Sequence, residues 1–75
     1  MYEILSGILV EDLHLNARDV GPDATCEDAG LDSLAMVELS MILQKRLNMQ
    51  IGDDELLATK RVADIVHMME AQVSP

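Results

Sequence analysis

Aromatic side chains are almost absent from this sequence of 75 residues, which contains one tyrosine, Tyr2, and no phenylalanine or tryptophan. Without aromatic rings the protein has no platform on which nucleic-acid bases can stack. Its core must therefore be built from aliphatic side chains and from six methionines. Methionine is flexible and adapts to irregular contents, so such a core is expected to tolerate rearrangement around an apolar ligand.

Cysteine and positive charge are also scarce. The single cysteine, Cys26, has no partner for an internal disulfide, and the two histidines are too far from it in sequence for a zinc site. Five Lys and Arg against 14 Asp and Glu give a net charge of −9. A surface this negative repels phosphate backbones and anionic lipids. We therefore predict no bound metal, no nucleic-acid partner and no insertion into a membrane.

The short length limits what the chain can do by itself. A protein of 75 residues buries only about 60 to 65% of the surface that its unfolded chain exposes, which leaves room for one small core and no enclosed active site. We predict a single domain over residues 1–75 that is not an enzyme. No apolar run approaches the ~18 residues of a membrane span, and the first residues lack the basic start of a signal peptide. These absences predict a cytoplasmic protein, and we expect it to be monomeric.

Apolar residues recur at helical spacing in three stretches. The first covers 3–15 and is expected to end at Asn16, and the second covers Ser33–Leu47 and is expected to end at Asn48. The third follows Thr59, which is expected to cap it. The apolar residues of these stretches are, in order, Ile4, Leu5, Ile8, Leu9 and Leu13; Met36, Leu39, Leu43 and Leu47; and Val62, Ile65, Val66, Met69 and Val73.

The remaining segments complete the predicted fold. Residues 16–32 contain glycine and proline and show no sustained period, which predicts a long loop. Residues 53–57 begin with three acids and are long enough for one or two helical turns. No alternating apolar pattern of the kind found in strands is present. We therefore predict an all-α protein, a small four-helix bundle with three main helices, one short helix and a long loop between the first two.

The junction of the long loop with the second helix is the segment with the most distinctive chemistry. There, Ser33 follows Asp32 at a helix start, where a hydroxyl is exposed beside backbone N–H groups that have no intrahelical partner. His14 and His67 lie on other elements, so no base is predicted to activate the serine as a nucleophile. Ser33 is better suited to being modified. The alternative is that Asp32 and Ser33 only cap the helix.

The residues around Ser33 resemble the acyl carrier protein family over nearly the whole chain. The resemblance is carried by Pro22-Asp23, by the run from Thr25 to Leu34 that ends in Asp-Ser-Leu, and by Val37-Glu38-Leu39 after it. It implies that Ser33 receives 4′-phosphopantetheine from coenzyme A, and that Asp32 and Leu34 on either side belong to the same cofactor-binding site. Acyl groups would then be carried as thioesters on the thiol of this arm and shuttled between biosynthetic enzymes.

The resemblance also implies partners and the surface that meets them. The expected partners are a phosphopantetheinyl transferase and acyl-processing enzymes such as an acyltransferase or a ketosynthase. A second apolar stripe on the helix after Ser33, separate from the core stripe, is expected to contact them, as are the acids of the short helix. The predicted contact residues are Leu34, Val37, Glu38, Met41, Asp53, Asp54 and Glu55.

Four positions depart from the pattern of carriers in fatty-acid synthesis. Ala35, Gln44, Lys45 and Arg46 stand where those carriers often have acids. We therefore expect a role in polyketide or other specialised metabolism rather than in housekeeping fatty-acid synthesis. One alternative is a peptidyl or aminoacyl carrier of a nonribosomal pathway, although Asp32 stands where such carriers usually have glycine or histidine. The other is an acidic helical interaction module without a prosthetic group.

Overall fold

The computed structural model describes residues 1–73 of the chain. In this part the chain forms helices and no strand, so the predicted all-α class is confirmed. The elements are α1 (Tyr2–Glu11), the 3₁₀ turn η1 (Ala17–Asp19), α2 (Cys26–Ala29), α3 (Ser33–Leu47), α4 (Asp53–Leu57) and α5 (Val62–Val73). The four predicted helices correspond to α1, α3, α4 and α5.

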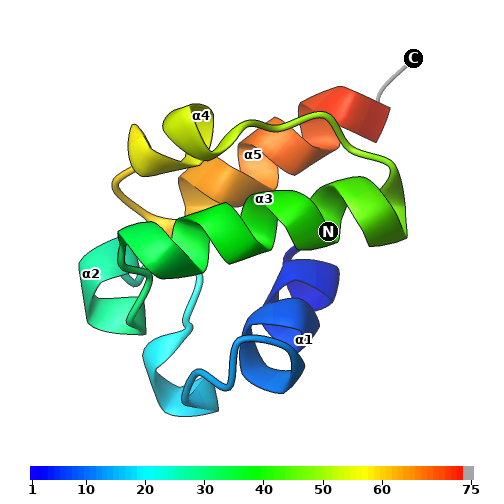
Figure 1. Cartoon of the computed structure of the whole chain (residues 1–75). Coiled ribbons are helices and arrows are strands. Elements are labelled where there is room, and N and C mark those ends of the chain that lie inside the picture. Colours follow the sequence, from blue (N-terminus) through cyan, green and yellow to red (C-terminus); the bar gives the residue numbers. More distant parts are fainter. Residues whose placement is uncertain (74–75) are drawn as a thin grey trace.

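The three long helices surround the core, and the short helices lie toward one end of α3 (Figure 1). In Figure 1, α3 crosses the molecule with α1 below it and α5 behind it, while α2 and α4 lie toward the end at which α3 begins. Helix α4 packs against α3. The whole body measures 32 × 22 × 21 Å. This arrangement places α2, α4 and the start of α3, where Ser33 lies, toward the same end of the molecule.

The core is aliphatic, as the composition predicts. Its members come from every helix and from the connections between them, and no polar or charged side chain of the described residues is buried. Burying each large aliphatic side chain of this core stabilises the fold by roughly 1.5 to 3 kcal/mol. The fully buried residues of largest volume are Leu5, Leu9, Leu39, Leu43, Leu56, Ile65, Met69, Val20 and Val62.

The first helix is shorter than predicted. α1 ends at Glu11, and the next residues turn, with the Leu13 N–H donating to the carbonyl of Ile8 at 3.3 Å and His14 in the left-handed region at φ 58°. Asn16 does not end α1; its side chain accepts the Arg18 N–H at 2.9 Å and caps η1. Leu13 packs on the core from outside the helix. An apolar residue at helical spacing therefore extended the prediction too far.

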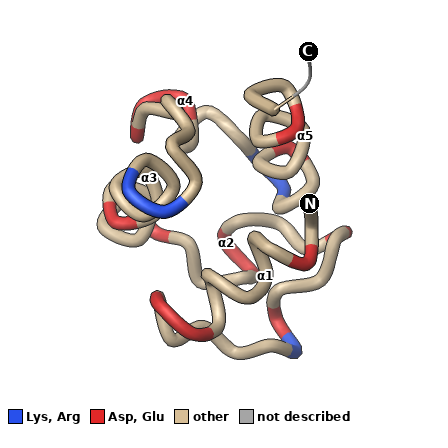
Figure 2. The backbone as a smooth tube through the Cα atoms, turned by 90° about the vertical axis from the view of Figure 1, so that its right-hand side faces the viewer, with Lys and Arg blue, Asp and Glu red and all other residues tan. Residues whose placement is uncertain are grey.

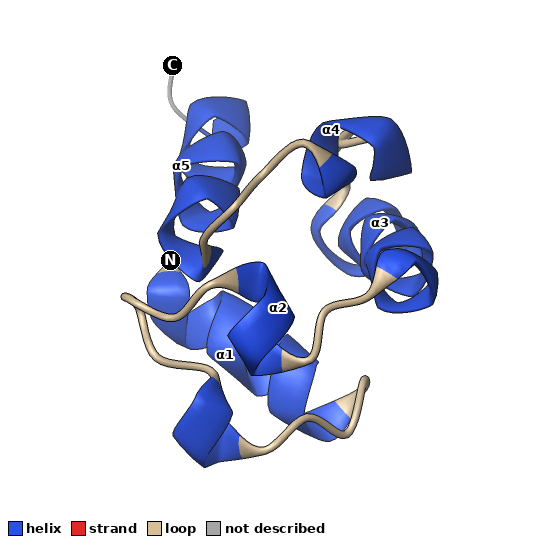
Figure 3. Cartoon of the chain, turned by 90° about the vertical axis from the view of Figure 1, so that its left-hand side faces the viewer, coloured by secondary structure: helices blue, strands red, loops and turns tan. Residues whose placement is uncertain are grey.

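The segment 16–32 is more ordered than the predicted loop. It contains η1 and the one-turn helix α2, which is capped by the Thr25 hydroxyl at 3.0 Å from the Asp28 N–H. An isolated bridge joins Thr25 to Arg61, with the Cys26 N–H donating to the carbonyl of Lys60 at 2.9 Å. Figure 3 shows how this segment wraps around the bundle before it enters α3. These backbone contacts, remote in sequence, fix the approach to Ser33.

The predictions for Asn48, as the end of one helix, and for Thr59, as the cap at the start of the next, have different outcomes. Asn48 ends α3 as predicted, in the left-handed conformation at φ 55°. Thr59 does not cap α5, because its hydroxyl donates to the carbonyl of Leu56. The carboxylate of Asp64 instead accepts the Arg61 N–H at 3.1 Å, just before the first turn of α5. The prediction that Thr59 caps α5 was wrong, because the carboxylate of Asp64, inside the helix, accepts the backbone N–H groups of Lys60 and Arg61.

Uncompensated negative charge should make the stability of this fold dependent on salt. Arg46 pairs with Asp12 at 2.7 Å, and His67 Nδ1 lies 3.9 Å from Glu70 Oε1, a pair that carries opposite charges only when the imidazole is protonated. Most of the 14 acids therefore repel one another over distances comparable with a Debye length of about 10 Å at 0.1 M salt. We expect screening to stabilise the native state.

The measurement is the melting temperature between about 0.02 M and 0.5 M KCl. Each kcal/mol of repulsion that is screened should raise it by about 4 to 8 °C. MgCl₂ at matched ionic strength is the control for cation binding, since no three metal-ligating side chains converge within residues 1–73. A melting temperature that stays constant across this range would contradict the prediction.

Candidate functional site

Ser33 is exposed on the first turn of α3 and takes no part in capping it. The N-cap is Asp32, whose Oδ1 accepts the Ala35 N–H at 2.8 Å and whose carbonyl accepts the Met36 N–H at 3.0 Å. The hydroxyl of Ser33 makes no hydrogen bond with any residue in 1–73. Asp32 therefore provides the cap, whereas the side chain of Ser33 caps nothing within residues 1–73.

The turn between α2 and α3 holds Ser33 at the surface. Gly30 ends α2 with φ 89°, and a Cβ at this position would lie 3.3 Å from Cδ2 of Leu15. The next residue, Leu31, is buried, and its N–H donates to the carbonyl of Cys26 at 2.8 Å. Only glycine adopts this backbone conformation without strain. The turn is thus fixed on its inner side, and it projects Ser33 outward.

An open pocket of about 310 Å³ lies beside Ser33, lined by Glu27, Gly30, Leu31 and Asp32. Two of these residues carry carboxylates, which would repel a phosphate group. The pocket therefore does not have the character of a phosphate-binding site. The exposed hydroxyl of Ser33 beside the pocket is instead an atom to which a group can be attached covalently.

Nothing in the described structure activates Ser33 for attack. His14 lies in the turn after α1 and His67 on α5, both exposed, and no hydrogen bond joins either ring to Ser33 within residues 1–73. A serine that acts as a nucleophile in its own active site needs a base within hydrogen-bonding reach. The geometry fits a serine that is modified by another protein.

The two predicted stripes of α3 are present on opposite faces. Met36, Leu39 and Leu43 are at most 2% exposed and form the core stripe, although Leu47 at the end of the helix is only half-buried. The second set consists of Leu34, Val37 and Met41, which are 67, 38 and 51% exposed, and of Glu38 beside them. We call Leu34, Val37, Glu38 and Met41 the exposed α3 stripe. It begins at Leu34, directly after Ser33, and leaves apolar side chains exposed to water.

Helix α4 presents acids at the surface beside α3. Asp53, Asp54 and Glu55 are all exposed, as predicted from the sequence. Glu55 also has a local structural contact, since its Oε2 accepts the Gly52 N–H at 2.9 Å. The sequence reasoning missed Leu57, which is 49% exposed on the same helix. The sequence does indicate that one leucine of this helix is exposed. When two leucines are consecutive on a short helix, only one of them can face the core.

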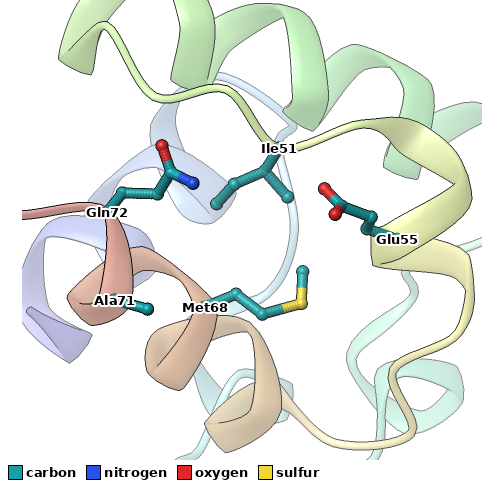
Figure 4. Close-up of a pocket in the computed structure, with 5 residues that line it drawn as sticks. All are labelled: Ile51, Glu55, Met68, Ala71 and Gln72. Carbon is teal, nitrogen blue, oxygen red and sulfur yellow. The ribbon is translucent and has the colours of Figure 1, made fainter.

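A second open pocket, of about 200 Å³, lies between α4 and α5 (Figure 4). Met68 and Ala71 line it from α5, and Ile51 from the connection between α3 and α4. Its polar lining consists of Glu55 and Gln72, and Gln72 Oε1 accepts the Gln50 N–H at 3.0 Å. In Figure 4 the side chain of Met68 extends across the opening. Met68 is thus a flexible part of the pocket's apolar lining.

Comparison with known proteins gives consistent matches along the chain. Residues 3–69 match the family model described as "Phosphopantetheine attachment site". The acyl carrier protein of Helicobacter hepaticus is 37% identical over 71 residues, which cover 93% of this chain and 93% of that protein. The acyl carrier protein of Helicobacter pylori strain J99 is 34% identical, covering 93% and 91%. That of Clostridium perfringens strain SM101 is 36% identical over 67 residues, covering 88% of each chain.

No solved structure shows a significant match to the chain. Within the described residues, no helix is both long enough and apolar enough to cross a membrane.

Proposed function

Because the chain belongs to the acyl carrier protein family, we propose that Ser33 is the residue to which its 4′-phosphopantetheine is attached. The protein is a carrier and not an enzyme. The observation that supports the assignment is that Ser33 is exposed on the first turn of α3 while Asp32 alone caps that helix. Leu34, which is the most exposed large apolar residue within 1–73, lies next to the proposed attachment point.

The attachment step needs little from the carrier. A phosphopantetheinyl transferase with Mg²⁺ brings Ser33 Oγ to the pyrophosphate of coenzyme A. The hydroxyl gives up its proton, Oγ forms a bond to phosphorus, and the broken phosphoanhydride releases adenosine 3′,5′-bisphosphate. Once attached, the arm supplies a terminal thiol that carries acyl groups as thioesters. The protein supplies an ordered, exposed hydroxyl and a surface for recognition.

The proposed partner surface consists of the exposed α3 stripe together with Asp53, Asp54 and Glu55 of α4. Acyl-processing enzymes and the transferase would meet this surface in turn, since it borders Ser33. The apolar residues of the stripe are exposed although the same helix already provides a full core stripe. Apolar residues in such a place are typical of surfaces that are covered by a partner.

For the pathway, we propose polyketide or other specialised metabolism rather than housekeeping fatty-acid synthesis. What supports this is the replacement of expected acids on α3, where Gln44, Lys45 and Arg46 are all exposed. The proposal includes a monomeric protein in the cytoplasm, which fits a single cysteine, Cys26, that is free and buried.

The test of the proposed attachment is intact-mass analysis after incubation with coenzyme A and a broad-specificity phosphopantetheinyl transferase. The expected result is a gain of one phosphopantetheinyl group per chain, and no gain when Mg²⁺ or the transferase is left out. A second group on the same chain, or none, would count against Ser33 as the single attachment site.

We further expect medium-length acyl cargo to be sheltered by the protein, because Met68 can move aside from the apolar wall of the pocket between α4 and α5. Each CH₂ group buried in this way contributes about 0.8 kcal/mol. The octanoyl form should therefore melt at least about 4 °C above the acetyl form. Equal melting temperatures for the two forms would show that the cargo stays in solvent.

A further inference from the structure

The charges around α3 are separated along its length. Between Arg18 and Lys45 the sequence contains no lysine or arginine. Acidic residues gather instead at the end of α3 where Ser33 lies. They belong to the N-cap of α3 and to α2 and α4, and these two short helices lie toward that end in Figure 1. The exposed acids there are Glu27, Asp28, Asp32, Asp53, Asp54 and Glu55. The other end of α3 carries Lys45 and Arg46 in its last turn.

Figure 2 looks toward that second end, where the near part of α3 is basic while α4 behind it is acidic. Lys45 lies about 18 Å from Ser33 along the helix axis, at 1.5 Å per residue. This separation is nearly two Debye lengths at 0.1 M salt, so the two ends act as separate charged regions. A partner that covers α3 from end to end meets both of them.

Lys45 belongs to the exposed α3 stripe by its position on the helix. Leu34, Glu38, Met41 and Lys45 are separated by four, three and four residues. This helical spacing places all four on one line along the surface of α3. The core stripe lies on the opposite face. Lys45 thus extends the stripe by one turn, and no contact of its side chain with a described residue competes for the ammonium group.

Arg46 differs from Lys45 although the two are neighbours. Its guanidinium lies 2.7 Å from the carboxylate of Asp12, at the end of α1. This ion pair turns Arg46 toward α1 and partly neutralises it. The single free positive charge on the stripe is therefore that of Lys45, within the residues that the structure describes.

We propose that Lys45 determines partner specificity, and that the enzyme surface which fits this carrier is basic opposite the Ser33 end of α3 and acidic opposite Lys45. The inference rests on the proposed function, because the partner is an enzyme that acts on Ser33 or on its arm. A partner whose docking surface is basic throughout fits the acidic end, and it places like charges together at Lys45. Such juxtaposed like charges suppress binding of the wrong partner.

The probe is a phosphopantetheinyl transferase whose carrier-docking surface is basic throughout, and the readout is kcat/KM for loading, followed by intact mass. Lys45→Glu should raise kcat/KM about three- to tenfold at low salt, because repulsion between two exposed charges is replaced by attraction. Lys60→Glu is the matched control, since Lys60 is exposed before α5 and changes the net charge equally. It should leave kcat/KM within about twofold of the unaltered chain.

The second arm uses a charge swap on the transferase. Its basic residue that faces position 45 is replaced by Glu, and the order of the two carriers should then reverse, with the unaltered chain loaded faster than the Lys45→Glu variant. If Lys45→Glu and Lys60→Glu behave alike with both transferases, Lys45 lies outside the contact and the inference is wrong. If no form of the chain gains mass with any transferase, the proposed attachment at Ser33 fails instead, so the two failures are distinguishable.

Discussion

Replacing Ser33 by alanine should abolish phosphopantetheinylation completely and leave the fold as stable as before. The hydroxyl makes no hydrogen bond with any residue that the structure describes, and Asp32 keeps its capping contact with the Ala35 N–H. Alanine at the first position of an exposed helix turn is well tolerated, so the free energy of unfolding should change by less than about 0.5 kcal/mol. The measurements are intact mass after loading and chemical denaturation.

Ser40→Ala is the matched control for this variant. The Ser40 hydroxyl donates to the carbonyl of Ile51 at 2.7 Å, so its loss should cost roughly 0.5 to 1.5 kcal/mol of stability while loading proceeds normally. The two serines of α3 thus have opposite expected effects. Ser6 lies within α1, and Ser74 lies outside the described residues. A Ser33→Ala chain that still gained one phosphopantetheinyl group would show that another residue is the attachment site.

Met41→Ala should lower acyl transfer with a native partner enzyme by about tenfold while the fold remains nearly as stable. Met41 is half-exposed in the free protein, and burial against a partner contributes roughly 1.5 kcal/mol or more to binding, which corresponds to about that factor. Glu38 contributes less, because an exposed ion pair is worth about 1 kcal/mol at most. Glu38→Ala should therefore reduce transfer by no more than about fivefold.

Two further variants separate binding from stability. Met36→Ala removes the same side chain from the buried face of α3 and should cost roughly 2 to 5 kcal/mol of stability. Ile4→Ala removes an exposed apolar side chain from α1 and should affect neither stability nor transfer. If Met41→Ala destabilises the fold as much as Met36→Ala does, the assignment of the two stripes is wrong. If transfer depends on Glu38 and not on Met41, the ranking of apolar and charged contacts is wrong.

The sequence predicted the helices well wherever one face of a helix supplies the core. On α3 both stripes were found, because apolar residues at spacings of three and four report which face is buried. The same signal misled at Leu13, which packs on the core after α1 has already ended. Periodicity records burial, and it does not record whether the backbone is still helical when the burial occurs.

The segment before Ser33 could not be predicted from local pattern. Its order depends on the contact of Thr25 with Arg61, on the hydrogen bond from Cys26 to Lys60, and on the Tyr2 hydroxyl, which donates to the carbonyl of Val20. Each of these joins residues that are 18 or more positions apart. Short-range propensity contains no information on such pairs, so a segment with glycine and proline was predicted to be a plain loop.

For the candidate site, the sequence predicted the exposure of Ser33 but not which residue caps the helix. The exposure of Ser33 at a helix start followed from its position after Asp32, and the structure agrees. The sequence did not predict which of Asp32 and Ser33 caps the helix, because either side chain can do so. Only the structure shows that Asp32 provides the cap. The place of Lys45 on α3 followed from the predicted helix, but its difference from Arg46 did not, because only the structure shows that Arg46 pairs with Asp12.

The central claim is that one serine, Ser33, carries the prosthetic arm, and fragmentation of a single peptide tests it most directly. Trypsin cleaves after Lys and Arg, so the loaded chain yields one peptide, residues 19–45, that contains both Ser33 and Ser40. Tandem mass spectrometry of this peptide should place the phosphopantetheinyl group on Ser33 in every loaded molecule. Fragments that carry the group on Ser40, or a loaded chain whose peptide 19–45 is unmodified, would contradict the account.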